Sequence, residues 1–203
     1  MKIFVSGIGT DVGKSVVSAA IIEATGADYW KPVQTGDKDT DFVSSLVTRP
    51  FRLHPAVYTF QKPASPHVAA AFENAVIQPE QLLLPETKNN LVVEGAGGLL
   101  VPLNNQFLVI DFIQQLNIPV VLVSRNYLGS INHTLLSIEA LQQRNIKLLG
   151  VVFNGIPNEA TEKAVLQFGN TQKLASIAEE DTIDKSAILK YKKEFENIFN
   201  YFL

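Results

Sequence analysis

The sequence predicts an α/β fold in which helices flank a mainly parallel central sheet. Apolar runs of strand length alternate with segments whose apolar residues follow helical spacing. Several of these runs are almost continuously apolar, as is typical of strands buried on both faces of a parallel sheet. A glycine-rich segment follows the first run directly. This alternation indicates a layered α/β architecture, and a length of 203 residues favours a single domain over residues 1–203.

The predicted elements follow one another in a regular order along most of the chain. Strands are expected at residues 3–6, 29–33, 91–93, 120–124 and 148–153, and helices at 14–24, 107–115 and 131–143. Residues 50–85 contain six of the ten prolines and are expected to form an irregular excursion with one short helix near residues 68–74. The tail is expected to be helical over residues 187–202 and to pack on the edge of the sheet.

Composition argues against several classes of function. The net charge of −3 comes from 17 basic and 20 acidic residues, a balance that argues against a nucleic-acid-binding surface. The absence of cysteine excludes disulfides and thiol nucleophiles, and three histidines argue against a histidine-based zinc site. There is no apolar run of about 18 residues and no signal-peptide pattern, so we expect a cytoplasmic protein with no membrane span.

The segment from Gly7 to Ser15, Gly-Ile-Gly-Thr-Asp-Val-Gly-Lys-Ser, has the features of a phosphate-binding loop. It follows a predicted strand and opens a predicted helix, so successive backbone N–H groups can surround an anion at the helix N-terminus. Lys14 is expected to reach the β- and γ-phosphates of ATP, and Ser15 to ligate Mg²⁺. The fold is therefore expected to be of the P-loop NTPase type. The nucleotide-binding residues predicted in this region are Gly9, Thr10, Asp11, Val12, Gly13, Lys14, Ser15 and Val16.

Charged side chains also stand at the ends of two further predicted strands. Lys31 ends the second strand, where ligands of open α/β sheets bind, although a solvent-exposed lysine is the alternative. Glu94 ends an apolar strand, and this pattern places a carboxylate beside magnesium in P-loop enzymes. An unpaired acid at a buried strand end would be costly, which argues against a purely structural Glu94. The glycines after it, including Gly97, allow close approach of the backbone to a nucleotide.

These segments, in this order, resemble the dethiobiotin synthetase family. The resemblance covers Ile3 to Asn154 and is carried mainly by residues 7–15, by Lys-Pro-Val-Gln-Thr-Gly at 31–36 and by the strand and glycines at 91–98. The loop is one residue longer than the usual P-loop, and Asp11 takes the place of the family's acidic residue near the substrate, where Glu is more common. A helix cap is the alternative role of Asp11.

The resemblance implies an enzyme of biotin biosynthesis that depends on ATP and Mg²⁺. Such an enzyme joins CO₂ to the two amines of 7,8-diaminononanoate and forms dethiobiotin, ADP and phosphate. The resemblance also implies a homodimer. The implied catalytic residues are Thr10, Asp11, Lys14 and Lys31.

The implied metal ligands are Ser15, Asp41 and Glu94. Asp41 aligns with the metal-binding aspartate of the family and directly precedes an apolar helical pattern. Mg²⁺ prefers one or two carboxylates together with phosphate oxygens. Asp41 could also cap the helix, and Asp37 and Asp39 are the alternative ligands.

The implied substrate-binding residues are Lys31, Thr35, Ser65, Gly129, Ser130, Ile131 and Asn132. The last four open a predicted helix, whose N-terminus suits a carboxylate, and the resemblance places this helix start across a twofold interface. Glu94, Gly97 and Asn154 are further implied nucleotide contacts, with Asn154 reading the adenine. The segments at 63–67, 128–133 and 154–155 are also typical of turns or of a helix start.

Two other functions use a P-loop. A cobyrinate amidating ligase usually carries a glutaminase domain with a nucleophilic cysteine, and this chain has neither the length nor a cysteine. A ParA-like switch ATPase has a lysine inside the loop, whereas none lies between Gly7 and Lys14. The composition also offers no basic face for DNA.

Overall fold

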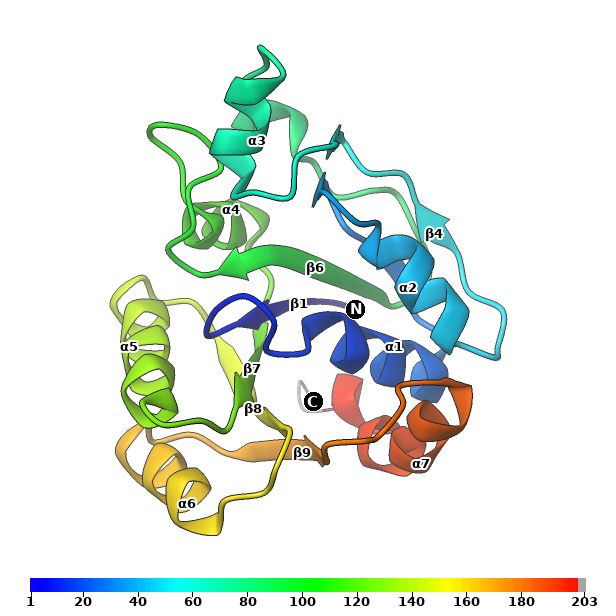
Figure 1. Ribbon diagram of the computed structural model, residues 1–203, viewed down its shortest axis with the longest axis vertical. Helices are drawn as coiled ribbons and strands as arrows, with labels where there is room; N and C mark the ends of the chain where they lie inside the picture. The colour runs from blue at the N-terminus through cyan, green and yellow to red at the C-terminus, as the bar shows by residue number, and fades with distance from the viewer. Residues whose placement is uncertain (201–203) are drawn as a thin grey trace.

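A seven-stranded parallel sheet forms the centre of the protein, whose computed structural model describes residues 1–200 (Figure 1). The strands lie in the order β4-β2-β6-β1-β7-β8-β9, and every neighbouring pair is parallel. In chain order they are β1 (Lys2–Gly7), β2 (Asp28–Trp30), β4 (Leu53–His54), β6 (Leu91–Gly98), β7 (Val120–Arg125), β8 (Leu148–Asn154) and β9 (Lys173–Ile177). The predicted fold class is therefore confirmed.

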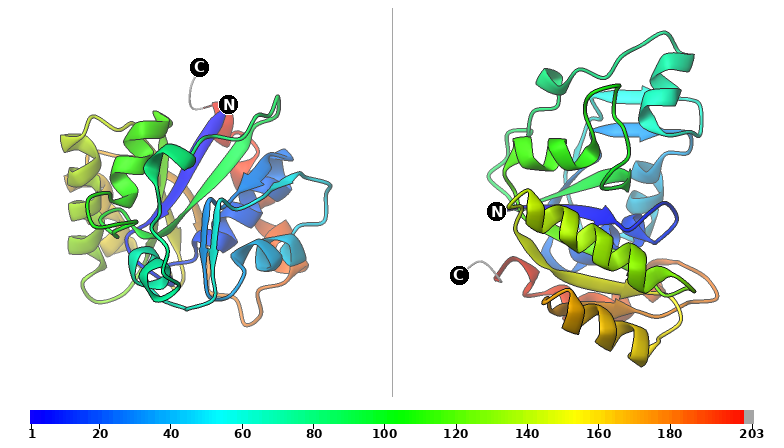
Figure 2. Two further views of the ribbon diagram at one scale, coloured as in Figure 1. Left: turned by 90° about the horizontal axis from the view of Figure 1, so that it is seen from above. Right: turned by 90° about the vertical axis from the view of Figure 1, so that its left-hand side faces the viewer.

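Helices cover both faces of this sheet (Figure 2). They are α1 (Lys14–Thr25), α2 (Asp39–Leu46), α3 (Pro66–Phe72), α4 (Val109–Leu116), α5 (Ser130–Gln143), α6 (Glu159–Phe168) and α7 (Lys185–Phe195), with short 3₁₀ turns at Pro79–Gln81 and Ile198–Asn200. A second, two-stranded parallel sheet joins β3 (Val33–Thr35) to β5 (Tyr58–Phe60) beside the main sheet.

Alternating side chains of the strands build a separate core on each face. In β1, Ile3 and Val5 are buried with apolar residues of α1, α2 and α7, whereas Phe4 between them is buried with residues of α4. The two-residue period of a strand explains this division. Farther along the sheet, Phe153 of β8 packs with Ile138 of α5 and with α6. Burial on both faces is the reason that these strands read as continuous apolar runs.

The structure differs from the sequence-based prediction at several elements. The expected strand 29–33 is divided between β2 and β3, because Pro32 has no N–H to donate to a ladder. The elements β4, β5, α6 and β9 were not predicted. The tail helix α7 ends at Phe195, and the last two residues of the predicted helix, 201 and 202, lie outside the described residues. The helix α7 packs against α1 as well as against the edge strand β9. It therefore covers part of one face of the sheet in addition to the edge that was expected.

No helix within residues 1–200 is both long enough and apolar enough to cross a bilayer.

A buried aspartate connects several segments near the edge of the sheet, at the amino-terminal end of β2. Asp28 begins β2, is 4% exposed and accepts hydrogen bonds from Thr87 Oγ1 at 2.7 Å and Asn89 Nδ2 at 3.0 Å. His54 Nε2, from the edge strand β4, lies 3.1 Å from the same carboxylate. This aspartate therefore joins β2 to β4 and to the loop that precedes β6.

We expect Asp28→Ala to lower the free energy of unfolding by about 1–3 kcal/mol, because it removes the carboxylate partner of the buried His54 imidazole and of the half-buried Thr87 hydroxyl. Chemical denaturation would measure the loss, and Asp181→Ala, at an exposed position, is the matched control. Equal stabilities of the two variants would contradict this role of Asp28.

Candidate active site

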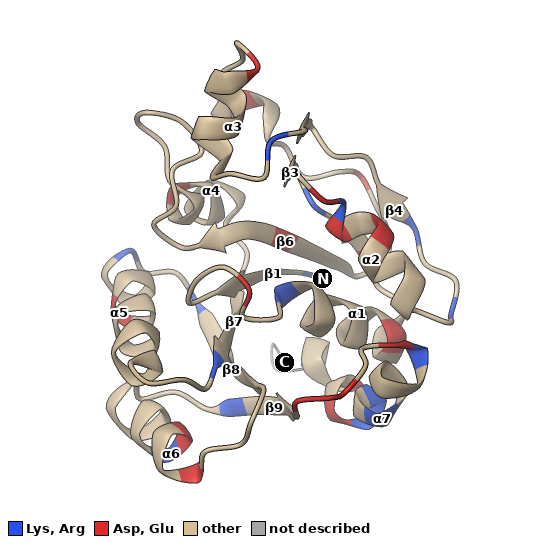
Figure 3. Ribbon diagram, in the orientation of Figure 1, with Lys and Arg blue, Asp and Glu red and all other residues tan. Residues whose placement is uncertain are grey.

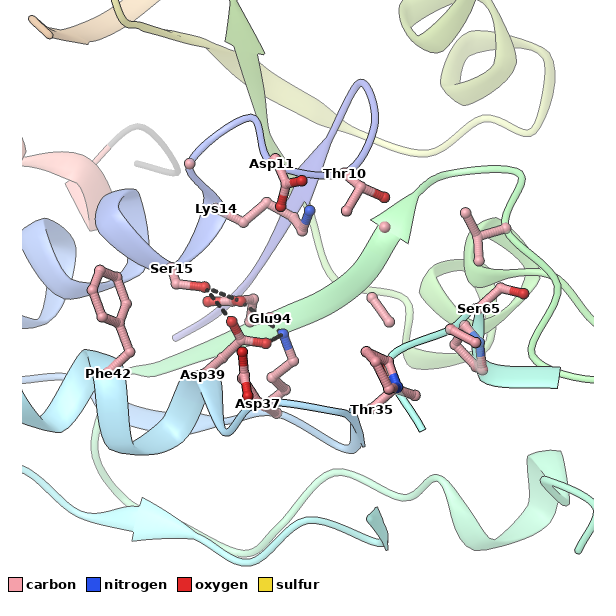
Figure 4. Close-up of a pocket in the computed structure, with 18 of the residues that line it drawn as sticks. Thr10, Asp11, Lys14, Ser15, Thr35, Asp37, Asp39, Phe42, Ser65 and Glu94 are labelled. Atoms are coloured by element: carbon pink, nitrogen blue, oxygen red, sulfur yellow. Dashed lines mark hydrogen bonds and ion pairs between the residues drawn. The ribbon is translucent and has the colours of Figure 1, made fainter. Parts of the chain in front are cut away.

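A pocket of about 720 Å³ lies at the carboxyl ends of β1 and β6, next to Lys31, the residue that follows β2 (Figure 4). The P-loop, the start of α1 and the residues after β6 form one side, and α2 with the segment that precedes α3 forms the other. The carboxyl ends of parallel strands are where ligands bind in open α/β sheets. Its lining includes Thr10, Asp11, Gly13, Lys14, Ser15, Val16, Lys31, Thr35, Asp37, Asp39, Ser65, Glu94 and Gly97.

The P-loop is held from beneath by the end of β8. Asn154 Nδ2 donates a hydrogen bond to the carbonyl of Val12 at 2.9 Å. The next residue, Gly13, has a φ of 93°, and a Cβ there would lie 2.1 Å from Asn154 Nδ2. Glycine is therefore required at this position both by backbone conformation and by space. Asn154 lies against the loop, and its reading of an adenine stays a prediction.

Lys14 and the loop tip face the pocket differently. The Lys14 side chain is buried and donates from Nζ to the carbonyl of Gly9 at 3.0 Å. Burial lowers the pKa of Lys14, although the nearby carboxylate of Glu94 opposes the shift. Thr10 and Asp11 are exposed at the tip. The residue that caps α1 is Gly13, with no side-chain hydrogen bond at the cap, so the alternative role of Asp11 as a helix cap is not what the fold uses.

Figure 3 shows an acidic position within β6. This acid is Glu94, the centre of the polar network in the pocket (Figure 4). Its side chain has no exposed surface, and it accepts four hydrogen bonds. Ser15 Oγ donates to Oε1 at 2.8 Å and Lys31 Nζ to the same oxygen at 3.0 Å. Ser18 and Tyr29 donate to Oε2, and neither of these two residues was predicted.

The second carboxylate that the structure brings to the pocket is Asp39, whereas Asp41, the predicted metal ligand, does not line the pocket. Ser15 Oγ lies 3.2 Å from Asp39 Oδ1, as the dashed line in Figure 4 marks. The helix α2 begins at Asp39, three residues before its expected start directly after Asp41. Asp39 lies four and seven residues before Val43 and Leu46, the buried residues of α2. It therefore shares their face of the helix, which is directed toward the protein interior. Asp41 is exposed to solvent.

Lys31 lies between the two carboxylates and is 5% exposed. It forms ion pairs with Glu94, at 3.0 Å, and with Asp39. Burial opposes its charge, but the two carboxylates outweigh burial and raise the pKa of Lys31. Burial likewise opposes the charge of Asp39, but Lys31 holds the pKa of that carboxyl below its ordinary value. Lys31 is therefore a cation at neutral pH rather than a base.

The donor set fits a magnesium ion. Ser15, Asp39 and Glu94 bring one hydroxyl and two carboxylates to the start of α1, all of them hard oxygen donors. No group of three or more His, Cys, Asp or Glu residues suited to a metal occurs within residues 1–200. An ion bound here would take its remaining ligands from phosphate oxygens and water, as Mg²⁺ does in nucleotide sites.

The predicted substrate residues fall into two places. Lys31, Thr35 and Ser65 line the pocket with the P-loop. Gly129, Ile131 and Asn132 instead line a second cavity of about 770 Å³ between α5 and the segment that follows β8. The remaining predicted member, Ser130, is fully buried. The pocket of a single chain therefore does not bring the two groups together.

Comparison with known proteins points to one family. A family model described as an AAA domain matches residues 1–187. The chain is 45% identical over 199 residues to the ATP-dependent dethiobiotin synthetase BioD of Christiangramia forsetii, covering 95% of this chain and 94% of that protein. It is 43% identical to the BioD of Cytophaga hutchinsonii, covering 97% of this chain and 98% of that one. It is also 45% identical to the biotin biosynthesis bifunctional protein BioCD of Bordetella avium, of which it spans only 43%.

Solved structures with the same fold belong to P-loop ATPases. A plasmid partition protein from Borrelia burgdorferi bound to AMPPNP superposes with a TM-score of 0.57 at 15% identity, covering 99% of this chain and 97% of that one. The cell division ATPase MinD from Pyrococcus furiosus gives a TM-score of 0.54 at 15% identity, with 97% and 99% coverage. Identities this low show a shared fold and nothing about activity.

The geometry makes Asp39 the residue whose loss should impair metal use. We expect Asp39→Asn to raise the Mg²⁺ concentration for half-maximal activity by about 10-fold or more, since carboxylates that contact the ion directly hold it in such sites. Asp41→Asn, two residues away on the exposed side of α2, is the control and should behave as the wild type. The reverse result in a Mg²⁺ titration of activity would return the ligand role to Asp41.

Proposed function

The chain belongs to the ATP-dependent dethiobiotin synthetase family, and we propose that its pocket joins CO₂ to the two amines of 7,8-diaminononanoate. The observation that carries this proposal is the convergence of the P-loop lysine, a second buried lysine, a hydroxyl and two carboxylates on one pocket. Two cations beside a phosphate-binding loop suit a reaction in which negative charge accumulates on two groups, a carbamate and a transferring phosphoryl group.

The reaction proceeds in three balanced steps. One amine adds to CO₂ and releases a proton to solvent, which gives a carbamate. A carbamate oxygen then attacks the γ-phosphorus of ATP and releases ADP. The second amine attacks the carbonyl carbon, displaces phosphate and releases a proton to solvent, which closes the cyclic urea of dethiobiotin. The chain's main contribution is to hold the reactants and to stabilise charge.

Each cation has a separate task in this scheme. Lys14 begins α1 beside the P-loop and stabilises the γ-phosphoryl group during transfer. Lys31, which also lines the pocket, holds the carbamate. Thr10 and Asp11 at the loop tip border the same space and contact the reacting amines. A magnesium ion held by Ser15, Asp39 and Glu94 would neutralise phosphate charge.

The rest of the substrate would be bound by a second copy of the chain. The diaminononanoate carboxylate must lie far from its amines, and the N-terminus of α5 offers free N–H groups and a favourable dipole. This helix start, Gly129–Asn132, borders a cavity separate from the P-loop pocket. Leu128, Ile131 and Leu136 expose apolar surface around it, which favours contact with another subunit. We therefore propose a homodimer in which each active site receives the α5 start of the partner subunit.

A product assay with Lys14→Ala tests the chemistry. Wild-type protein with diaminononanoate, bicarbonate, Mg²⁺ and ATP should form dethiobiotin and ADP, detected by mass spectrometry. Lys14→Ala should lose at least about 10²-fold in turnover, because it removes a charge that stabilises the transition state. Circular dichroism should show an unchanged fold. A folded Lys14→Ala variant with near-normal turnover would contradict the role of Lys14 in phosphoryl transfer and the P-loop assignment.

Subunit mixing tests the shared site. One inactive variant is Lys14→Ala, and the other carries Ile131→Asp and Asn132→Asp at exposed positions of α5, while buried Ser130 is left intact. Random exchange makes about half of the dimers mixed, and each mixed dimer has one undamaged site, so about a quarter of wild-type sites should return. Activity that stays at background after confirmed exchange would mean that each site is built within one chain.

A further inference from the structure

The two oxygens of Glu94 have different surroundings. Oε1 accepts hydrogen bonds from Ser15 and Lys31, which both line the pocket. Oε2 accepts from Ser18 Oγ at 2.7 Å and from Tyr29 Oη at 3.0 Å, and both of these residues are fully buried. Each oxygen therefore accepts two hydrogen bonds, but the donors to Oε2 are fully buried hydroxyl groups, whereas the donors to Oε1 line the pocket and include Ser15, itself a proposed metal ligand.

Helix and strand geometry explain how four donors reach one carboxylate. Ser15 and Ser18 are three residues apart on α1 and therefore project from the same face of the helix. Tyr29 and Lys31 are two residues apart along extended chain and therefore project to the same side. In each pair one member reaches the pocket-side oxygen and the other reaches the buried oxygen.

We propose that Tyr29 and Ser18 are positioning residues that make Glu94 a one-oxygen ligand and thereby select Mg²⁺ over Ca²⁺. The inference rests on the proposed use of Mg²⁺ and ATP in this pocket. With Oε2 held by two hydroxyl groups, the carboxylate cannot rotate to offer both oxygens to a cation. Neither Tyr29 nor Ser18 lines the pocket, so both act through Glu94.

The selection follows from the coordination preferences of the two ions. Mg²⁺ requires near-ideal octahedral geometry with short metal–oxygen distances, which a single fixed oxygen suits. Ca²⁺ accepts six to eight ligands in flexible geometry and often takes both oxygens of one carboxylate. Removing the hydrogen bonds to Oε2 would let the carboxylate rotate. The single fixed oxygen that suits Mg²⁺ would then be lost, and both oxygens would become available to Ca²⁺.

The test compares binding of the two metal complexes of a non-hydrolysable ATP analogue by calorimetry. Tyr29→Phe removes one hydroxyl with little change in shape, and Ser18→Ala removes the other donor to Oε2. Each variant should bind the Mg²⁺ complex about 10-fold more weakly, the range found when groups that orient metal ligands are removed. The Ca²⁺ complex should lose less, so the preference for Mg²⁺ should fall.

Tyr191→Phe is the matched control. Tyr191 is also largely buried and also donates to a carboxylate, that of Glu180, at 2.5 Å, but it lies on α7 outside the pocket. Its loss should leave the ratio of the two affinities unchanged. If Tyr29→Phe and Ser18→Ala weaken both complexes equally, or neither, the positioning role is overturned and the hydroxyl groups serve stability alone.

The outcomes separate this inference from the proposed function. A wild-type protein that binds the analogue equally with and without a divalent cation overturns both the metal assignment and the role of Tyr29. A wild-type protein with the expected metal preference that forms no dethiobiotin overturns the activity and leaves the positioning role standing. Should Tyr29→Phe fail to fold, Ser18→Ala decides the result by itself.

Discussion

The carboxylate of Glu94 is the constraint on which the arrangement of the pocket depends. Burying an isolated carboxylate costs on the order of tens of kcal/mol in a medium of low dielectric constant, so this group must be paired and hydrogen-bonded. Its four donors come from α1, from β2 and from the residue that follows β2. These elements therefore have one relative position in which the carboxylate is satisfied. The same position brings Ser15 and Lys31 to the wall of the pocket.

The residues that carry the chemistry were largely readable from the sequence because their signals are local. The P-loop lies between a strand and a helix, and a motif in that context specifies its own backbone conformation. Glu94 and Lys31 were recognised because each stands where an apolar run ends. Asp39 was missed because three aspartates within five residues differ only in where the helix begins. A shift of two residues turns a side chain by more than half a circle around the helix axis.

Features that depend on distant segments were beyond the sequence. The edge strand β9 and the pair β3–β5 are short and weakly patterned, and their pairing is set by neighbours far along the chain. Tyr29 and Ser18 look like ordinary core positions until Glu94 is placed between them. Their spacings to Lys31 and Ser15 are a usable signal, because each pair shares one face of its element. That signal has meaning only once β6 is known to lie beside β2, and pairing order is a property of the whole sheet.

The contact between Gly13 and Asn154 limits the ways in which this loop can evolve. Any side chain at position 13 meets the amide of Asn154, so the first obstacle could be removed by a smaller residue at position 154. The left-handed backbone at Gly13 would still disfavour every residue with a Cβ. Replacing Asn154 by a smaller residue would also remove its hydrogen bond to the Val12 carbonyl. No single substitution at position 154 therefore allows a residue other than glycine at position 13. Sequence change in the P-loop is restricted by Asn154, a residue far away along the chain.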